Sequence, residues 1–168
     1  NFYYEVESFS NLDPYHNLQP REILAQSHFL YAPEEGEDLP FAENEPVWRI
    51  DFARFGRQPY EVLGLTTAWM PSENERFLDA IRAEPTVPLI NLLCRLRNDT
   101  CQTIDQSVRA RIVTSDLAKT LRTRPGSPIL EILRTFRNPR GEVLLCSRNY
   151  FKGNNFSLDI RLTRKPFA

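Results

Sequence analysis

The residues best suited to do chemistry are polar side chains at alternating positions of segments with β-strand character. They are Arg49, Asp51, Thr66, Ser147 and Asn149. Arg49 and Asp51 fall on one face of the segment Pro46–Phe55, and Trp48, Ile50 and Phe52 fall on the other. If helices cover the apolar face of the sheet, polar residues on the opposite face can line a cleft for a small molecule. The alternative interpretation is that this polar face is simply exposed to solvent.

The short motifs that carry a catalytic mechanism do not occur in the chain: there is no GxSxG, HExxH, GxGxxG or phosphate-binding P-loop. Neither His16 nor His28 has a serine or cysteine partner in its sequence surroundings. Cys94, Cys101 and Cys146 form no CxxC pair and are too scattered to build a zinc site with these histidines. We therefore predict reduced thiols, no metal, no cofactor and no enzymatic activity.

The composition restricts the class of protein further. With 21 basic and 22 acidic residues among 168, the formal net charge is -1, which argues against general nucleic-acid binding by this segment. No apolar run is long enough to span a membrane, and the first residues lack the features of a signal peptide. We predict a single cytoplasmic domain covering residues 1–168. Because the sequence starts at Asn1 without a Met, we expect it to be a piece of a longer protein.

Two helix-and-hairpin units organise the chain. In the later unit, Ser115 is expected to cap a short helix that Arg124-Pro125-Gly126 ends, and two strands follow, joined by a turn at Asn138–Gly141. In the earlier unit, a hairpin over Pro46–Met70 turns at Gly56, with a bulge at Gly64. Further strands are predicted at Phe2–Val6, Arg21–Tyr31, Thr100–Val113 and Phe156–Thr163, and further helices at Glu73–Arg82 and Val87–Arg97. Two hairpins in one antiparallel sheet, with helices on one side, define an α+β fold.

Several short motifs follow one another in a particular order. In the second half of the chain they are Leu117–Leu121, Gly126-Ser127-Pro128-Ile129-Leu130, Ile132, Arg134, Gly141-Glu142-Val143 and Tyr150-Phe151-Lys152-Gly153-Asn154-Asn155-Phe156. In the first half they are Ser8-Phe9-Ser10, Arg54, Gly56, Pro59 and Ala68-Trp69-Met70-Pro71. In order and spacing this set resembles the UTRA effector-binding domain of GntR-type transcription regulators, HutC subfamily. The resemblance covers nearly the whole chain.

The resemblance implies a chorismate-lyase-like α+β domain that binds a small-molecule effector and forms a homodimer. DNA would be bound only by a winged-helix domain on the N-terminal side, which this chain lacks. The predicted ligand-binding residues combine the polar strand positions with those that the resemblance suggests. They are Phe9, Ser10, Arg49, Asp51, Thr66, Ser147, Asn149 and Phe151.

Departures from the family pattern bear on the effector. Members that bind sugar phosphates place two alternating arginines on the first hairpin, and by register these positions are Asp51 and Ala53 here. A serine of the family's phosphate-side helix falls near Pro88, while a glutamate and a tyrosine fall at Leu145 and Phe151. Without a paired guanidinium fork a phosphate is not held bidentately. We predict that the effector is not a sugar phosphate. Among the remaining polar positions, Arg49 is expected to bind a carboxylate of the effector, and Asp51 an amine or hydroxyl.

Other functions remain open at this point. One alternative is a lyase on the same fold, which would need convergent arginine and glutamate side chains in a closed pocket. Another is a ligand-free dimerisation module, which the apolar Leu145 and Phe151 favour.

Overall fold

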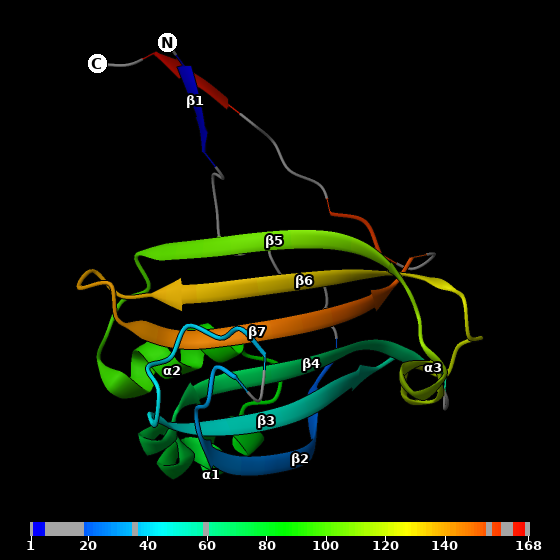
Figure 1. The fold of residues 1–168 in the computed structure, drawn as a ribbon, viewed down its shortest axis with the longest axis horizontal. Helices are drawn as coiled ribbons and strands as arrows, with labels where there is room; N and C mark the ends of the chain where they lie inside the picture. The colour runs from blue at the N-terminus through cyan, green and yellow to red at the C-terminus, as the bar shows by residue number, and fades with distance from the viewer. Residues whose placement is uncertain are drawn as a thin grey trace.

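One antiparallel sheet forms the centre of the molecule. The computed structural model describes residues 2–5, 19–34, 37–58, 61–153, 156–158 and 163–166. The strands lie in the order β2-β3-β4-β7-β6-β5 (Figure 1). They are β2 (Arg21–Leu30), β3 (Pro46–Phe55), β4 (Val62–Pro71), β5 (Thr103–Ile112), β6 (Pro128–Arg137) and β7 (Val143–Lys152). A separate antiparallel pair, β1 (Phe2–Glu5) with β8 (Thr163–Pro166), brings the two ends of the chain together.

The two predicted hairpins are both present and lie side by side at the centre of the sheet. They are β3–β4 and β6–β7, and β4 pairs with β7. The turn of the second hairpin forms because the Asn138 Oδ1 accepts hydrogen bonds from the backbone N–H groups of Arg140 and Glu142, each at 3.0 Å. Gly141 then adopts a φ of 80°, which favours glycine. The predicted bulge also occurs, because a register shift leaves an extra residue between Val62 and Gly64.

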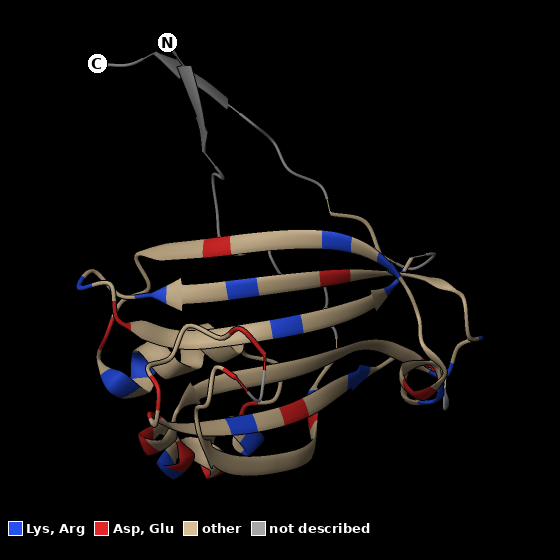
Figure 2. Ribbon diagram, in the orientation of Figure 1, with Lys and Arg blue, Asp and Glu red and all other residues tan. Residues whose placement is uncertain are grey.

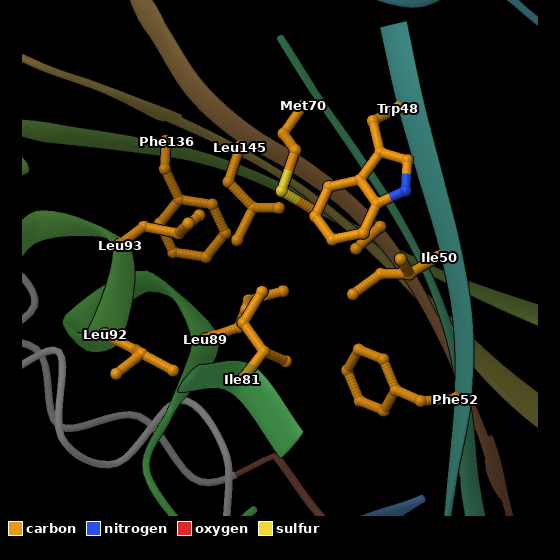
Figure 3. Packing of buried hydrophobic residues seen from close by; sticks show 11 residues of the cluster. Trp48, Ile50, Phe52, Met70, Ile81, Leu89, Leu92, Leu93, Phe136 and Leu145 are labelled. Carbon is orange, nitrogen blue, oxygen red and sulfur yellow. The ribbon is translucent and has the colours of Figure 1, made fainter. Parts of the chain in front are cut away.

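Two helical segments cover one face of the sheet, which we call the helix face. They are the 3₁₀ turn η2 (Ser72–Phe77) with α1 (Leu78–Ala83), and α2 (Leu89–Arg97). Their apolar residues pack against alternate residues of β3, β4, β6 and β7 (Figure 3). The buried cluster comprises Trp48, Ile50, Phe52, Ala68, Met70, Ile81, Leu89, Leu92, Leu93, Phe136 and Leu145. The helix predicted at Glu73–Arg82 therefore exists, but its first part is a 3₁₀ turn.

The third helix corrects the prediction that all helices lie on one side. In α3 (Ser115–Leu121), Ala118 and Leu121 pack with Ala53, Leu65 and other residues on the opposite side of the sheet, the reverse face. Ala53 and Leu65 alternate with helix-face residues of β3 and β4, so they project from that other side. In Figure 1, α1 and α2 lie behind the sheet and α3 lies at its right-hand end.

Both ends of α3 differ from the prediction. The N-cap is Thr114 rather than Ser115, and it makes no side-chain capping bond. The helix ends at Leu121, before Arg124-Pro125-Gly126, because Arg122 turns into the left-handed region with a φ of 54°. The Thr123 N–H then reaches back to the Ala118 carbonyl at 3.0 Å, which closes the helix without proline or glycine.

The C-terminal strand prediction is corrected as well. Residues 156–158 are not in a strand, residues 159–162 lie outside the described part, and β8 starts only at Thr163. Basic and acidic residues are interspersed along the strands rather than gathered in a basic stripe (Figure 2). Among the helices that the structure describes, none is long and apolar enough to cross a membrane.

Candidate ligand-binding site

The structure divides the predicted ligand-binding residues between the two faces of the sheet. Thr66 pairs with Asn149 on one side and with Phe52 on the other, so all three share the helix face. Ser147 and Phe151 alternate with Asn149 along β7 and share it too. Arg49 and Asp51 lie on the reverse face. Phe9 and Ser10 lie outside the described residues.

The expectation of a single cleft opposite the helices is therefore not met. Four of the predicted residues lie beneath the same side as α1 and α2, because the register places Phe52, and not Asp51, directly opposite Thr66. Alternation within one strand does not show which residues of the neighbouring strand lie on the same face of the sheet. The two groups need to be considered as separate sites.

On the helix face, a patch of buried polar side chains, the polar floor, extends from the apolar core. It consists of Thr66, Ser147, Asn149 and Arg134, each less than 9% exposed. The Thr66 hydroxyl donates to the Asn149 Oδ1 at 2.8 Å. The Asn149 amide nitrogen donates to the Ile132 carbonyl at 3.2 Å and the Ser147 hydroxyl at 3.3 Å. These bonds hold the polar groups in fixed positions on rigid strands.

Arg134 is the member of the polar floor that was not predicted as a site residue. It lies directly opposite Ser147 on β6, and its Nε donates to the Gln106 Oε1 at 2.7 Å. A signal was present, because Arg134 interrupts the apolar alternation of Ile132 and Phe136 on the same face. The helix-face positions of β4, β6 and β7 carry no carboxylate among the described residues. The floor therefore suits a neutral or anionic group better than a cation.

Aromatic rings border the polar floor. Phe151 lies over Gly64, where an added Cβ would approach its ring to 3.0 Å, so the missing side chain makes room for the ring. Phe156 stacks on Phe151 with centroids 4.1 Å apart and an interplanar angle of 7°. On the other side, the Phe52 ring lies 5.5 Å from the Arg54 guanidinium carbon. Polar groups between aromatic rings are typical of a small-molecule site.

On the reverse face, Arg49 and Asp51 form an ion pair instead of converging with the polar floor. The Arg49 Nε and Nη2 donate to the two carboxylate oxygens of Asp51, each at 3.0 Å. The Thr67 hydroxyl donates to the Asp51 Oδ1 at 2.6 Å. Nearby, Arg148 forms an ion pair with Glu37. The guanidinium carbons of Arg49 and Arg148 lie 5.9 and 5.3 Å from the Trp69 ring centre.

The thiols show no sign of activation. Desolvation by burial raises the pKa of Cys94 and Cys146, and raises that of Cys101 to about 11. A nucleophilic cysteine has the opposite shift, because the thiolate is its reactive form. No group of three or more His, Cys, Asp or Glu side chains among the described residues could hold a metal ion.

We expect slow alkylation of Cys101 by iodoacetamide at pH 8, with the rate still rising at pH 10. A free thiol of ordinary pKa would be largely ionised by then, whereas burial keeps Cys101 protonated up to a pKa of about 11. Mass spectrometry of the native protein over a pH series measures this, and free cysteine is the control. Labelling of Cys101 as fast as free cysteine at pH 8 would contradict the raised pKa.

One known domain family matches most of the chain. The UTRA domain matches residues 21–157, which include every strand of the central sheet. The chain belongs to the UTRA domain family. No curated protein is similar enough to this UTRA domain to count as a match.

Solved structures show the same fold at low sequence identity. One is described as a transcriptional regulator from Streptomyces coelicolor, with 21% identity, a TM-score of 0.75 and coverage of 99% of this chain and 100% of the other. Another is described as the ligand-binding domain of a GntR-family regulator from Bordetella bronchiseptica, with 17% identity, a TM-score of 0.67 and coverage of 89% and 92%. PhnF from Mycobacterium smegmatis has 14% identity and a TM-score of 0.69; the match covers 83% of this UTRA domain and 60% of PhnF.

Proposed function

We propose that this UTRA domain is the effector-binding and dimerisation domain of a bacterial GntR-type transcription regulator of the HutC subfamily. It senses a small metabolite in the cytoplasm, and binding at the helix face changes how an upstream winged-helix domain binds DNA. The observation that carries the proposal is the polar floor, which places four buried polar side chains in fixed positions beside an apolar core. Family membership and a near-neutral charge of -1 are consistent with an effector domain.

A sugar phosphate remains a poor fit for this site. Arg134 and Arg54 are both buried on the helix face, but they lie on β6 and β3, three strand positions apart. At about 4.8 Å per strand their backbones are roughly 14 Å apart, so they are not the alternating pair on one strand that is expected of a sugar-phosphate site. The residue before α2 is Pro88, which supplies no hydroxyl there. We therefore propose an effector with a carboxylate or neutral polar groups, such as an acid derived from an amino acid.

Catalysis is not part of the proposal. A lyase would need a group able to transfer a proton, and the described helix-face residues of β4, β6 and β7 include no carboxylate or histidine. A ligand-free module would fill this region with apolar side chains. Instead, Leu145 packs into the core under α2, and the next helix-face positions along β7 are Ser147 and Asn149.

A thermal-shift screen of the UTRA domain tests the proposal. We expect amino-acid-derived acids to raise Tm and hexose 6-phosphates to leave it unchanged. A ligand at about 100 times its Kd stabilises by about 2.7 kcal/mol, which corresponds to roughly 5–10 °C for a domain of this size. Stabilisation by a hexose 6-phosphate and by none of the acids would refute the proposed effector class.

A matched pair of variants locates the binding. Ser147→Ala removes a hydroxyl from the polar floor, whereas Ser107→Ala makes the same change at an exposed position of β5. We expect only Ser147→Ala to weaken the stabilising ligand, by up to about tenfold for one lost hydrogen bond. In the full-length protein, the same ligand should change the affinity for operator DNA. A ligand that stabilises the domain without any effect on DNA binding would contradict the regulatory role.

A further inference from the structure

A hollow lies on the reverse face, separated from the polar floor by the thickness of the sheet. It has a volume of about 420 Å³, within the range of small-molecule sites. Phe29, Tyr31, Leu39 and Trp69 supply apolar walls, and Glu37 and Arg49 also line it. One wall is made by Tyr31, Ala32, Glu37 and Leu39, which lie between β2 and β3 in the sequence.

The walls of this reverse-face hollow are held in place before any ligand arrives. The Tyr31 hydroxyl accepts a hydrogen bond from the Leu39 backbone N–H at 2.9 Å and donates to the Glu37 carbonyl at 3.1 Å. Both rings at the base are buried, with Tyr31 at 3% and Trp69 at 2% exposed. Tyr31, Leu39 and Trp69 belong to one buried apolar cluster, so the base of the hollow is apolar and closely packed.

Two opposite charges border the same hollow, each oriented by a partner. Arg49 uses Nε and Nη2 for Asp51, so its Nη1 makes no hydrogen bond within the described part of the chain. Glu37 uses Oε1 for Arg148, and its Oε2 has no hydrogen bond to the described residues. One cationic donor and one anionic acceptor therefore remain available beside an apolar surface.

We propose that the reverse-face hollow binds a zwitterionic α-amino acid with an apolar side chain. Arg49 Nη1 takes the α-carboxylate, Glu37 takes the α-ammonium, and the side chain packs against Phe29, Leu39 and Trp69. A simple organic acid would leave the Glu37 carboxylate without a partner in the ligand, and a simple amine would do the same to Arg49. Charge-assisted hydrogen bonds at both ends distinguish an amino acid from either analogue. This site does not depend on the proposed effector site.

The two tryptophans of the chain report separately on the two faces. Trp48 is buried in the helix-face cluster, and Trp69 forms the base of the hollow. With 5-fluorotryptophan incorporated, ¹⁹F NMR gives one signal for each, and Trp69→Phe assigns them. We expect L-phenylalanine to shift the Trp69 signal and leave that of Trp48 in place. 3-Phenylpropionate and phenethylamine, which each lack one charge, should bind about tenfold more weakly or worse.

Charge-neutral variants test the two proposed contacts. We expect Arg49→Gln and Glu37→Gln each to raise the Kd for L-phenylalanine about tenfold or more. Arg109→Gln, which removes an exposed guanidinium from the reverse face of β5, should leave the Kd unchanged. The Trp48 signal checks that each variant is folded. The proposal is overturned if L-phenylalanine, L-leucine and L-tryptophan give no response at millimolar concentration. It is also overturned if only the Trp48 signal moves and Arg49→Gln binds as the wild type does. Neither result affects the helix-face site, which Ser147→Ala tests separately.

Discussion

Replacing Trp48 by alanine is expected to lower the free energy of unfolding by about 3–5 kcal/mol. Its side chain is fully buried and belongs to the cluster in which α1 and α2 pack on the sheet (Figure 3). The change removes the largest buried side chain of this interface and leaves a cavity beside Met70 and Ile50. It also removes the indole N–H that donates to the Gln26 Oε1 at 3.1 Å.

Urea denaturation followed by circular dichroism measures this loss. A domain of this kind is stabilised by roughly 5–15 kcal/mol in total, so Trp48→Ala removes a large share. Leu24→Ala on the adjacent strand β2 is the matched control, because Leu24 is 49% exposed and its loss should cost less than about 0.5 kcal/mol. Equal effects of the two variants would contradict the packing of α1 and α2 on β3.

The hairpins could be predicted from the sequence because their signals are local. Strand β3 alternates apolar and polar residues from Trp48 to Phe52, and Asn138 and Gly141 form a turn from bonds within four residues. The core residues of α2 could be predicted for the same reason, since helical spacing places Leu89, Leu92 and Leu93 on one side. These features depend only on near neighbours in the chain.

The composition of the site could not be predicted in the same way. Which residues of β3 and β7 share a face depends on the pairing of both strands with β4, and the bulge beside Gly64 shifts that pairing at its end. One residue of difference in register exchanges the two faces. For this reason Asp51 and Asn149, both correctly placed on strands, lie on opposite sides of the sheet.

Contacts between residues far apart in the sequence could not be predicted from local patterns either. Glu37 and Arg148 are 111 residues apart in sequence, and only the folded sheet brings this pair to Trp69. The placement of α3 is similar, because its apolar residues fit either face of a sheet. Ala53 and Leu65, both apolar, lie on the reverse face and belong to the same buried cluster as Leu121.

Asn149→Asp is expected to destabilise the domain by about 1–3 kcal/mol at pH 7, because it buries a carboxylate and leaves the Ile132 carbonyl without its donor. In the wild type, the Asn149 amide nitrogen donates to the Ile132 carbonyl. A carboxylate has no proton to donate there, and it faces the carbonyl oxygen instead. Asn149 is 8% exposed, so water makes up for the lost bond only in part.

The pH dependence of this variant distinguishes a buried charge from a simple loss of packing. Burial raises the pKa of the new carboxyl in the folded state above its unfolded value of about 3.9, so the folded state binds the proton more tightly. Stability relative to the wild type should therefore improve as the pH falls through the raised folded pKa, and worsen as it rises. Urea denaturation of Asn149→Asp at pH 7 and pH 5 measures this, with Ser107→Asp on exposed β5 as the control. A loss that does not change with pH, or one as small as that of Ser107→Asp, would contradict burial of the new carboxyl.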